Sequence, residues 1–232
     1  MKKNEVAGTA GQTEPGSDQL KRKLKKDGGF QEGDIFLRLH RAISWLKAAE
    51  EHADNDDIKF ISLWISFNSC YAIDNSMELR TGKGISEKYN IYSFLKVLVS
   101  LDHDQKIFGL LWNRFSSEIR LILDNQFLFE EFWEYKRGER KDFTKELAAS
   151  IEKANQLLAK RDVAQLLEII LHRLYVLRNQ IFHGGATYKG RVNRTQVKDV
   201  VRILSRLVPV VIEIMIENKD NDWGKAYFPV VN

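Results

Sequence analysis

Hydrophobic residues recur at helical spacing along most of this chain. The clearest stripe is Leu166, Ile170, Leu174, Leu177 and Ile181, with steps of four, four, three and four residues. This spacing is typical of one buried face of an α-helix and predicts a helix over residues 163–183. Two glycines, 184 and 185, follow directly and predict the end of that helix, because glycine adopts the left-handed cap conformation at little steric cost.

The same periodicity predicts further helices over residues 34–53, 58–74, 91–101, 105–124, 127–135, 143–159 and 195–218. The helix over 58–74 is apolar almost all round, as expected for a helix at the centre of a bundle. We expect Asp34 to cap the first helix and Asp56 or Asp57 to cap the second. Pro209 is expected to kink the last helix. Because no alternating strand pattern persists, the predicted fold class is all-α.

Residues 1–29 differ from the rest in composition, with Gly, Ser, Thr, Pro and Lys and few apolar side chains. We therefore predict a disordered basic N-terminal tail over 1–29 and a single helical domain over 30–232. Residues 1–27 hold seven basic and four acidic side chains. The cluster from Lys21 to Lys26 is compatible with contact to nucleic acid, but a role in keeping the tail soluble is slightly favoured.

Three polar residues lie near the end of the predicted helix over 163–183. Asn179 and His183 are one turn apart and share a side, whereas Arg178 is about 140° from His183 around the axis, with a side chain long enough to reach the same cleft. A histidine can transfer a proton between a ribose 2′-hydroxyl and a departing 5′-oxygen. An arginine can stabilise the charge on the phosphorus centre. The alternative is structural: Arg178 as a helix-capping donor and His183 as a hydrogen-bonded histidine.

The arginine, the polar residue directly after it and the histidine five places on resemble the Arg-x(4–6)-His signature of the HEPN superfamily. The string over 178–185, Arg-Asn-Gln-Ile-Phe-His-Gly-Gly, is most similar to the Apea-like branch, as is the spacing of Phe60, Trp64 and Asn68. This resemblance implies a HEPN-like helical bundle with additional helices. It also implies a metal-independent endoribonuclease whose active site forms at the interface of a homodimer. Arg178, Asn179 and His183 would be its catalytic residues.

The resemblance further implies a role as a toxin or in anti-phage defence, with RNA as substrate and an antitoxin or another defence-system protein as a partner. It leaves open a catalytically inert module that binds RNA, nucleotides or a protein. The segment over 184–206 holds six basic side chains and only Asp199 as an acid. From it we expect Lys189, Arg191 and Arg194 to attract RNA phosphates, the alternative being a solvated basic surface.

Asn68 is a polar residue in an otherwise apolar helix and needs a hydrogen-bonding partner. One possible position is beside the cleft of Arg178 and His183, where it would contact RNA. Trp64, one turn earlier, is more simply explained as a core residue than as a ligand-binding one.

Composition narrows the remaining possibilities. The five histidines have no spacing typical of a metal site, so we expect neither a metal nor another cofactor. The single cysteine, Cys70, excludes an intramolecular disulfide and a cysteine-rich zinc site. No apolar run approaches the ~20 residues of a membrane span, and the polar N-terminus lacks a signal-peptide pattern, so we expect a cytoplasmic protein without membrane contact.

The apolar segment from Leu207 to Ile216 is expected to need cover from a second copy.

Overall fold

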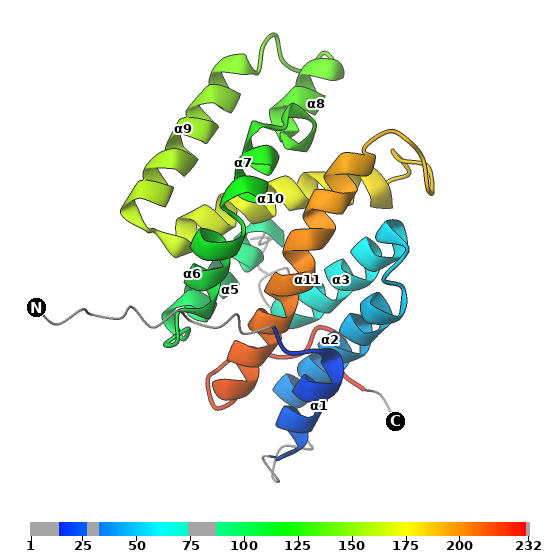
Figure 1. Cartoon of the computed structure of the whole chain (residues 1–232), viewed down its shortest axis with the longest axis vertical. Helices are drawn as coiled ribbons and strands as arrows, with labels where there is room; N and C mark the ends of the chain where they lie inside the picture. The colour runs from blue at the N-terminus through cyan, green and yellow to red at the C-terminus, as the bar shows by residue number, and fades with distance from the viewer. Residues whose placement is uncertain (1–13, 27–32, 74–86, 231–232) are drawn as a thin grey trace, which may run out of the picture.

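The computed structural model describes residues 14–26, 33–73 and 87–230, and in that part of the chain the elements are helical (Figure 1). An isolated antiparallel bridge joins Ile73 and Ala226. The predicted all-α class is confirmed. The elements are α1 (Ser17–Lys26), α2 (Asp34–Glu51), α3 (Asp56–Tyr71), α5 (Glu87–Ser100), α6 (Lys106–Gly109), the π-helical turn η1 (Leu110–Arg114), α7 (Ser116–Asp124), the 3-10 turn η2 (Gln126–Leu128), α8 (Glu130–Lys136), α9 (Thr144–Lys160), α10 (Val163–Phe182) and α11 (Arg194–Glu217).

Helices α3 and α11 form the centre of the bundle. Helix α3 packs against α2, α5 and α11, and its aromatic residues Phe60, Trp64 and Phe67 are at most 2% exposed. The prediction that this helix is central, with Trp64 in the core, is therefore confirmed. Helix α11 packs against α1, α2, α3 and α7, and Pro209 lies within it.

The segment from Leu207 to Ile216 is covered within this chain. All of its residues except Glu213 are buried, because α11 carries them into the space between the N-terminal helices and the rest of the bundle. The expectation that this segment needs cover from a second copy was wrong. Its continuous apolar composition reflects a helix buried on nearly every side.

Residues 17–26 form helix α1, which corrects the prediction of a disordered tail over 1–29. Leu20 and Leu24 are buried, and α1 packs on α2 and α11 (Figure 1). The Lys23 ammonium forms ion pairs with Glu213 at 2.8 Å and Glu217 at 2.5 Å. Two leucines four residues apart are enough for a short helix to dock when other helices supply the apolar groove. Residues 1–13 and 27–29 of the predicted tail lie outside the described residues.

Three local predictions also need correction. Asp34 does not cap α2, because the N-cap residue of this helix is Gly33. The Asp34 carboxylate instead accepts a hydrogen bond from the Ala226 N–H. Helix α3 is capped by Asn55, whose side chain accepts the Ile58 N–H at 3.3 Å. The single helix predicted over 105–124 is divided into α6, η1 and α7, because the N–H of buried Phe115 bonds five residues back to the Leu110 carbonyl.

A smaller aromatic cluster joins α8 to the start of α9. Phe129, Phe132 and Phe143 form it, and the Phe132 ring meets the Phe143 ring edge-on with centroids 5.2 Å apart. Helix α9 also packs along α10. These helices therefore form a second layer on α10, which positions their polar side chains beside it. In the described chain, no helix is long and apolar enough to cross a bilayer.

Replacing Leu20 by alanine should release α1 from the bundle. The substitution removes a fully buried side chain and should weaken docking by about 2–5 kcal/mol. Limited trypsin digestion measures this, since α1 carries several lysines, and cleavage within α1 should accelerate at least about tenfold. The control is Asp18→Ala, at an exposed position of the same helix. Equal cleavage rates for the two variants would contradict the docked helix.

Candidate functional site

Helix α10 ends in a glycine-dependent cap. The Gly185 N–H bonds to the Gln180 carbonyl at 2.6 Å and the Gly184 N–H to the Ile181 carbonyl at 3.2 Å, the pair of bonds that defines a Schellman motif. Gly184 has φ +76°, and a Cβ on Gly185 would lie 2.8 Å from the Gln180 carbonyl oxygen. Both glycines are therefore required where they stand. The predicted helix end is confirmed, and it places His183 at the exposed C-cap position.

Arg178 is held against the last turns of α10. Its Nη1 donates to the Asn179 Oδ1 at 2.9 Å, and its Cζ lies 5.6 Å from the ring centroid of Tyr175 and 4.9 Å from that of Phe182. Its Nε is buried and has no hydrogen-bond partner among the described residues. The guanidinium is thus fixed by one hydrogen bond and two cation–π contacts.

A carboxylate behind Arg178 organises two tyrosines. Glu87, at the start of α5, accepts hydrogen bonds from the Tyr71 hydroxyl at 2.6 Å and from the Tyr175 hydroxyl at 2.9 Å. Burial, and then these bonds to Glu87, raise the pKa of both phenols, while the charge of Arg178 acts in the opposite direction. Both tyrosines are therefore neutral donors at physiological pH.

Sequence reasoning missed this network. Glu87 is 88 residues from Tyr175, and neither residue belongs to a local motif. The one available signal was indirect: Tyr175 lies three residues before Arg178, the spacing at which helical side chains meet.

The His183 side chain forms no hydrogen bond to the side chain of Arg178 or Asn179. Its backbone N–H bonds to the Asn179 carbonyl at 3.0 Å. The imidazole is exposed, with no hydrogen-bond partner in the part of the chain that the structure describes. The structure therefore joins Arg178 to Asn179 directly and leaves the histidine ring accessible to a ligand.

Asn68 lies on the wall of a neighbouring groove. The groove is also lined by Arg41, Trp45, Tyr71 and Glu87. Asn68 is half-buried and shares this groove with the two residues that connect, through Tyr175, to Arg178. It is thus close to the predicted cleft but separated from Arg178 by the tyrosine network.

The loop after α10 is anchored by Asp57. The Asp57 Oδ2 accepts the Lys189 N–H at 2.8 Å and the Arg194 Nη2 at 3.0 Å. Arg194 also donates through Nε to the Gly190 carbonyl at 3.1 Å. The expectation that Asp57 caps α3 is replaced by this tertiary role. Of the three residues expected to attract RNA, Arg194 is engaged in an ion pair.

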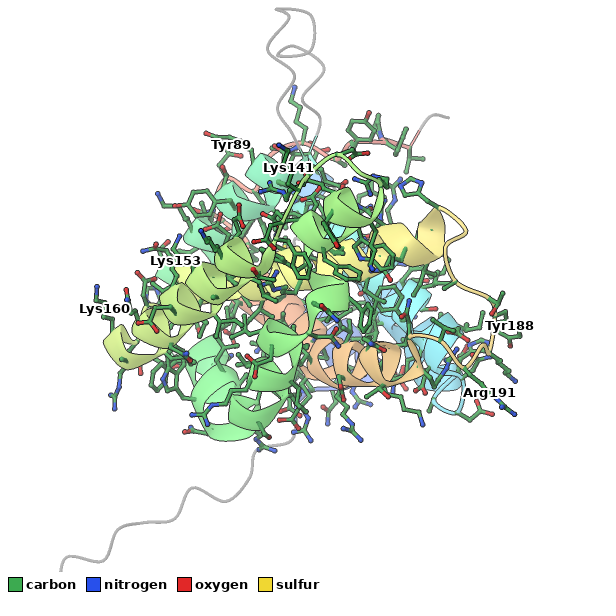
Figure 2. All side chains as sticks on the ribbon, turned by 90° about the horizontal axis from the view of Figure 1, so that it is seen from above. Tyr89, Lys141, Lys153, Lys160, Tyr188 and Arg191 are labelled. Carbon is green, nitrogen blue, oxygen red and sulfur yellow. The ribbon has the colours of Figure 1, made fainter. Side chains whose placement is uncertain are left out.

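Arg191 and Lys189 differ from Arg194. Arg191 is exposed at the outer edge of the loop, with Tyr188 near it (Figure 2). The Lys189 ammonium lies 5.4 Å from the Tyr188 ring centroid, and the Tyr188 hydroxyl accepts from Asn55 at 2.6 Å. The loop is therefore held on α3 while its two remaining cations face outward.

Asp57→Ala should destabilise the fold more than Asp56→Ala. Both substitutions remove a carboxylate from the first turn of α3, so their effects on the helix dipole are similar. Only Asp57→Ala also leaves the Lys189 N–H and the Arg194 guanidinium without their acceptor. We expect it to lower the free energy of unfolding by about 1–3 kcal/mol more, measured by urea denaturation. An equal loss in both variants would exclude a structural role for the Asp57–Arg194 pair.

Neither a metal cluster nor a relative identifies the chemistry of this site. Over residues 14–26, 33–73 and 87–230, no group of three or more His, Cys, Asp or Glu side chains lies close enough to hold a metal ion. The chain matches no family model, no curated protein and no solved structure.

Proposed function

We propose that this protein is an endoribonuclease of HEPN type. The observation that carries the proposal is the half-buried Arg178 guanidinium, fixed by Asn179 and two rings, on the same helix end as the exposed imidazole of His183. A guanidinium that is partly exposed can bind a phosphate oxygen. RNA supplies that phosphate together with the 2′-hydroxyl that a histidine can activate.

The reaction follows from these two groups. The ribose 2′-oxygen attacks the adjacent phosphorus as its proton passes to a histidine, and the bond to the 5′-oxygen breaks as that oxygen receives a proton. The products are a 2′,3′-cyclic phosphate and a free 5′-hydroxyl. Arg178 stabilises the additional negative charge on the phosphorane oxygens. DNA should not react, because it lacks the attacking hydroxyl.

Asn179 acts as a positioning residue in this scheme. Its Oδ1 accepts from Arg178, which limits the rotation of the guanidinium towards solvent. Tyr175 supports the same guanidinium from the other side and is itself held by Glu87. Lys189 and Arg191 add positive charge near the helix end, where they would attract RNA phosphates in a salt-dependent manner.

A homodimer would complete the site. Each chain contributes one histidine at this position, whereas the general acid and the general base can be two different histidines. Exposed apolar side chains lie at the end of α10 and in the loop that follows it: Phe182 is 42% exposed, Tyr188 63% and Val192 78%. These residues would provide the contact surface for a second copy, with the two motifs facing each other. A toxin or anti-phage role, with a cytoplasmic location and an antitoxin or other defence protein as a partner, would be consistent with such an enzyme.

Cleavage should be detectable with single-stranded RNA in the presence of EDTA, with cyclic phosphate ends as product. His183→Ala should lower the rate by about 10²–10⁴-fold through the loss of proton transfer. Arg178→Ala should cause a comparable loss, since the phosphorane charge is no longer stabilised. Asn179→Ala should be milder, because it leaves the guanidinium in place but less fixed. End-labelled RNA on a denaturing gel gives these rates.

Two control variants separate catalysis from contamination and from unfolding. His103→Ala and Arg120→Ala remove the same residue types at exposed positions of the bundle and should retain full activity. Cleavage that is equal in wild type and His183→Ala would indicate a contaminating nuclease. No cleavage by wild type would favour the alternative, an inert HEPN module that binds RNA or a protein; Arg178→Ala would then only weaken binding.

The dimeric arrangement predicts complementation between inactive variants. A mixed dimer of Arg178→Ala and His183→Ala retains one arginine and one histidine at a shared site. Mixing the two variants should therefore restore part of the activity that each lacks alone, and light scattering should give the mass of a dimer at micromolar concentration. A monomer with full wild-type activity would rule out a composite site.

A further inference from the structure

A second cavity lies along α10, before the motif. It has a volume of about 370 Å³ and lies between α5, α8, α9 and α10. Its polar lining includes Arg173, Glu131 and Ser150, and its apolar walls include Ile91 and Ile169. The volume falls within the range of sites for small molecules. Arg178, Asn179 and His183 do not line this cavity, whereas Tyr175, which supports the Arg178 guanidinium, does.

Arg173 is a buried cation that lacks an anion. The residue is 1% exposed, its Nη2 donates to the Ser150 Oγ at 3.0 Å, and its Cζ lies 4.2 Å from the ring centroid of Phe129. Its Nε has no hydrogen-bond partner, and it forms no ion pair with any described residue. Burial lowers its pKa to about 10, so it remains charged at neutral pH. A buried charge of this kind is costly unless an anion pairs with it.

Glu131 is a carboxylate with one unpaired oxygen. Its Oε2 is buried and has no hydrogen-bond donor among the residues that the structure describes. Its charge acts on Arg173, yet the two side chains form no ion pair, although both line the cavity. The lining of the cavity therefore includes a cation that lacks an ion pair and a carboxylate with one oxygen that lacks a donor.

The lining charges are balanced. Three basic side chains, Lys88, Lys153 and Arg173, are matched by three acidic ones, Glu131, Glu146 and Glu168. His172, also in the lining, has its pKa lowered, chiefly by burial and then by Lys88, so it adds no charge at neutral pH. A simple anion would be repelled by the three carboxylates and would give Glu131 no hydrogen-bond donor. A simple cation would give Arg173 no anion with which to pair.

We propose that this cavity binds a small zwitterion with an apolar body, of the α-amino acid class. Its carboxylate would lie on the Arg173 guanidinium, and its ammonium group would donate to Glu131. Its side chain would pack against Ile91 and Ile169. Such a ligand satisfies both buried groups and matches the net charge of the lining. The site is distinct from the one proposed for RNA cleavage, because none of Arg178, Asn179 and His183 contributes to it.

Titration calorimetry with the full chain tests this inference. The probes are L-leucine, 4-methylpentanoate, which lacks the ammonium group, and 3-methylbutylamine, which lacks the carboxylate. L-leucine should bind, and each analogue should bind at least about tenfold more weakly, because each loses one charge-assisted hydrogen bond. Glu131→Gln should weaken L-leucine binding by a similar factor. Glu51→Gln, at an exposed position of α2, is the matched control and should leave binding unchanged.

The outcomes are distinct. Binding of 4-methylpentanoate as tight as that of L-leucine would show an anion site and overturn the zwitterion proposal. Lack of saturable binding by L-leucine at millimolar concentration would overturn it as well. An unchanged affinity in Glu131→Gln would exclude the proposed ammonium contact. The comparison of the three probes uses only the wild-type chain, so it does not depend on the folding of any variant.

Discussion

The structure depends on the burial of one face of α10. Six of its apolar side chains are at most 1% exposed: Leu166, Leu167, Ile170, Leu171, Leu174 and Leu177. Full burial of such a side chain contributes about 1.5–3 kcal/mol each. This face packs against α5, α7, α9 and α11, so α10 has little freedom to rotate. The same packing consequently fixes the position of every polar side chain on α10, including its arginines.

Two arginines on this helix differ in burial because of how the helix packs. Arg173 and Arg178 are five residues apart, but Arg173 is almost fully buried beside Phe129, whereas Arg178 is half-buried near the exposed helix end. Arg178 is supported by Asn179 and can meet a phosphate that approaches from solvent. Arg173 instead lines the cavity between α5, α8, α9 and α10 and donates to Ser150.

The loop that follows α10 is linked to the opposite part of the bundle. Asp57 on α3 holds both the Lys189 N–H and the Arg194 side chain, and Gln180 bonds to Asn193 at 2.9 Å and to the Phe127 carbonyl at 2.7 Å. These bonds keep the end of α10 in a defined relation to its surroundings. Within the basic segment over 184–206, Arg194, Arg202 and Arg206 thus form ion pairs, whereas Lys189 and Arg191 are exposed.

The sequence by itself determined the features that depend on residues close together in the chain. Helical periodicity predicted the all-α class and the central role of α3, and the double glycine predicted the end of α10. Only the tertiary structure decided which polar groups meet: Glu87 with Tyr175, and Asp57 with Arg194. It also placed Arg173 and Glu131 in the lining of one cavity. It also decided that α1 docks and that residues 207–216 are covered within the chain. The physical reason is that a buried face repeats with the helical period and leaves a local pattern, whereas a long-range polar contact needs only two residues and leaves none.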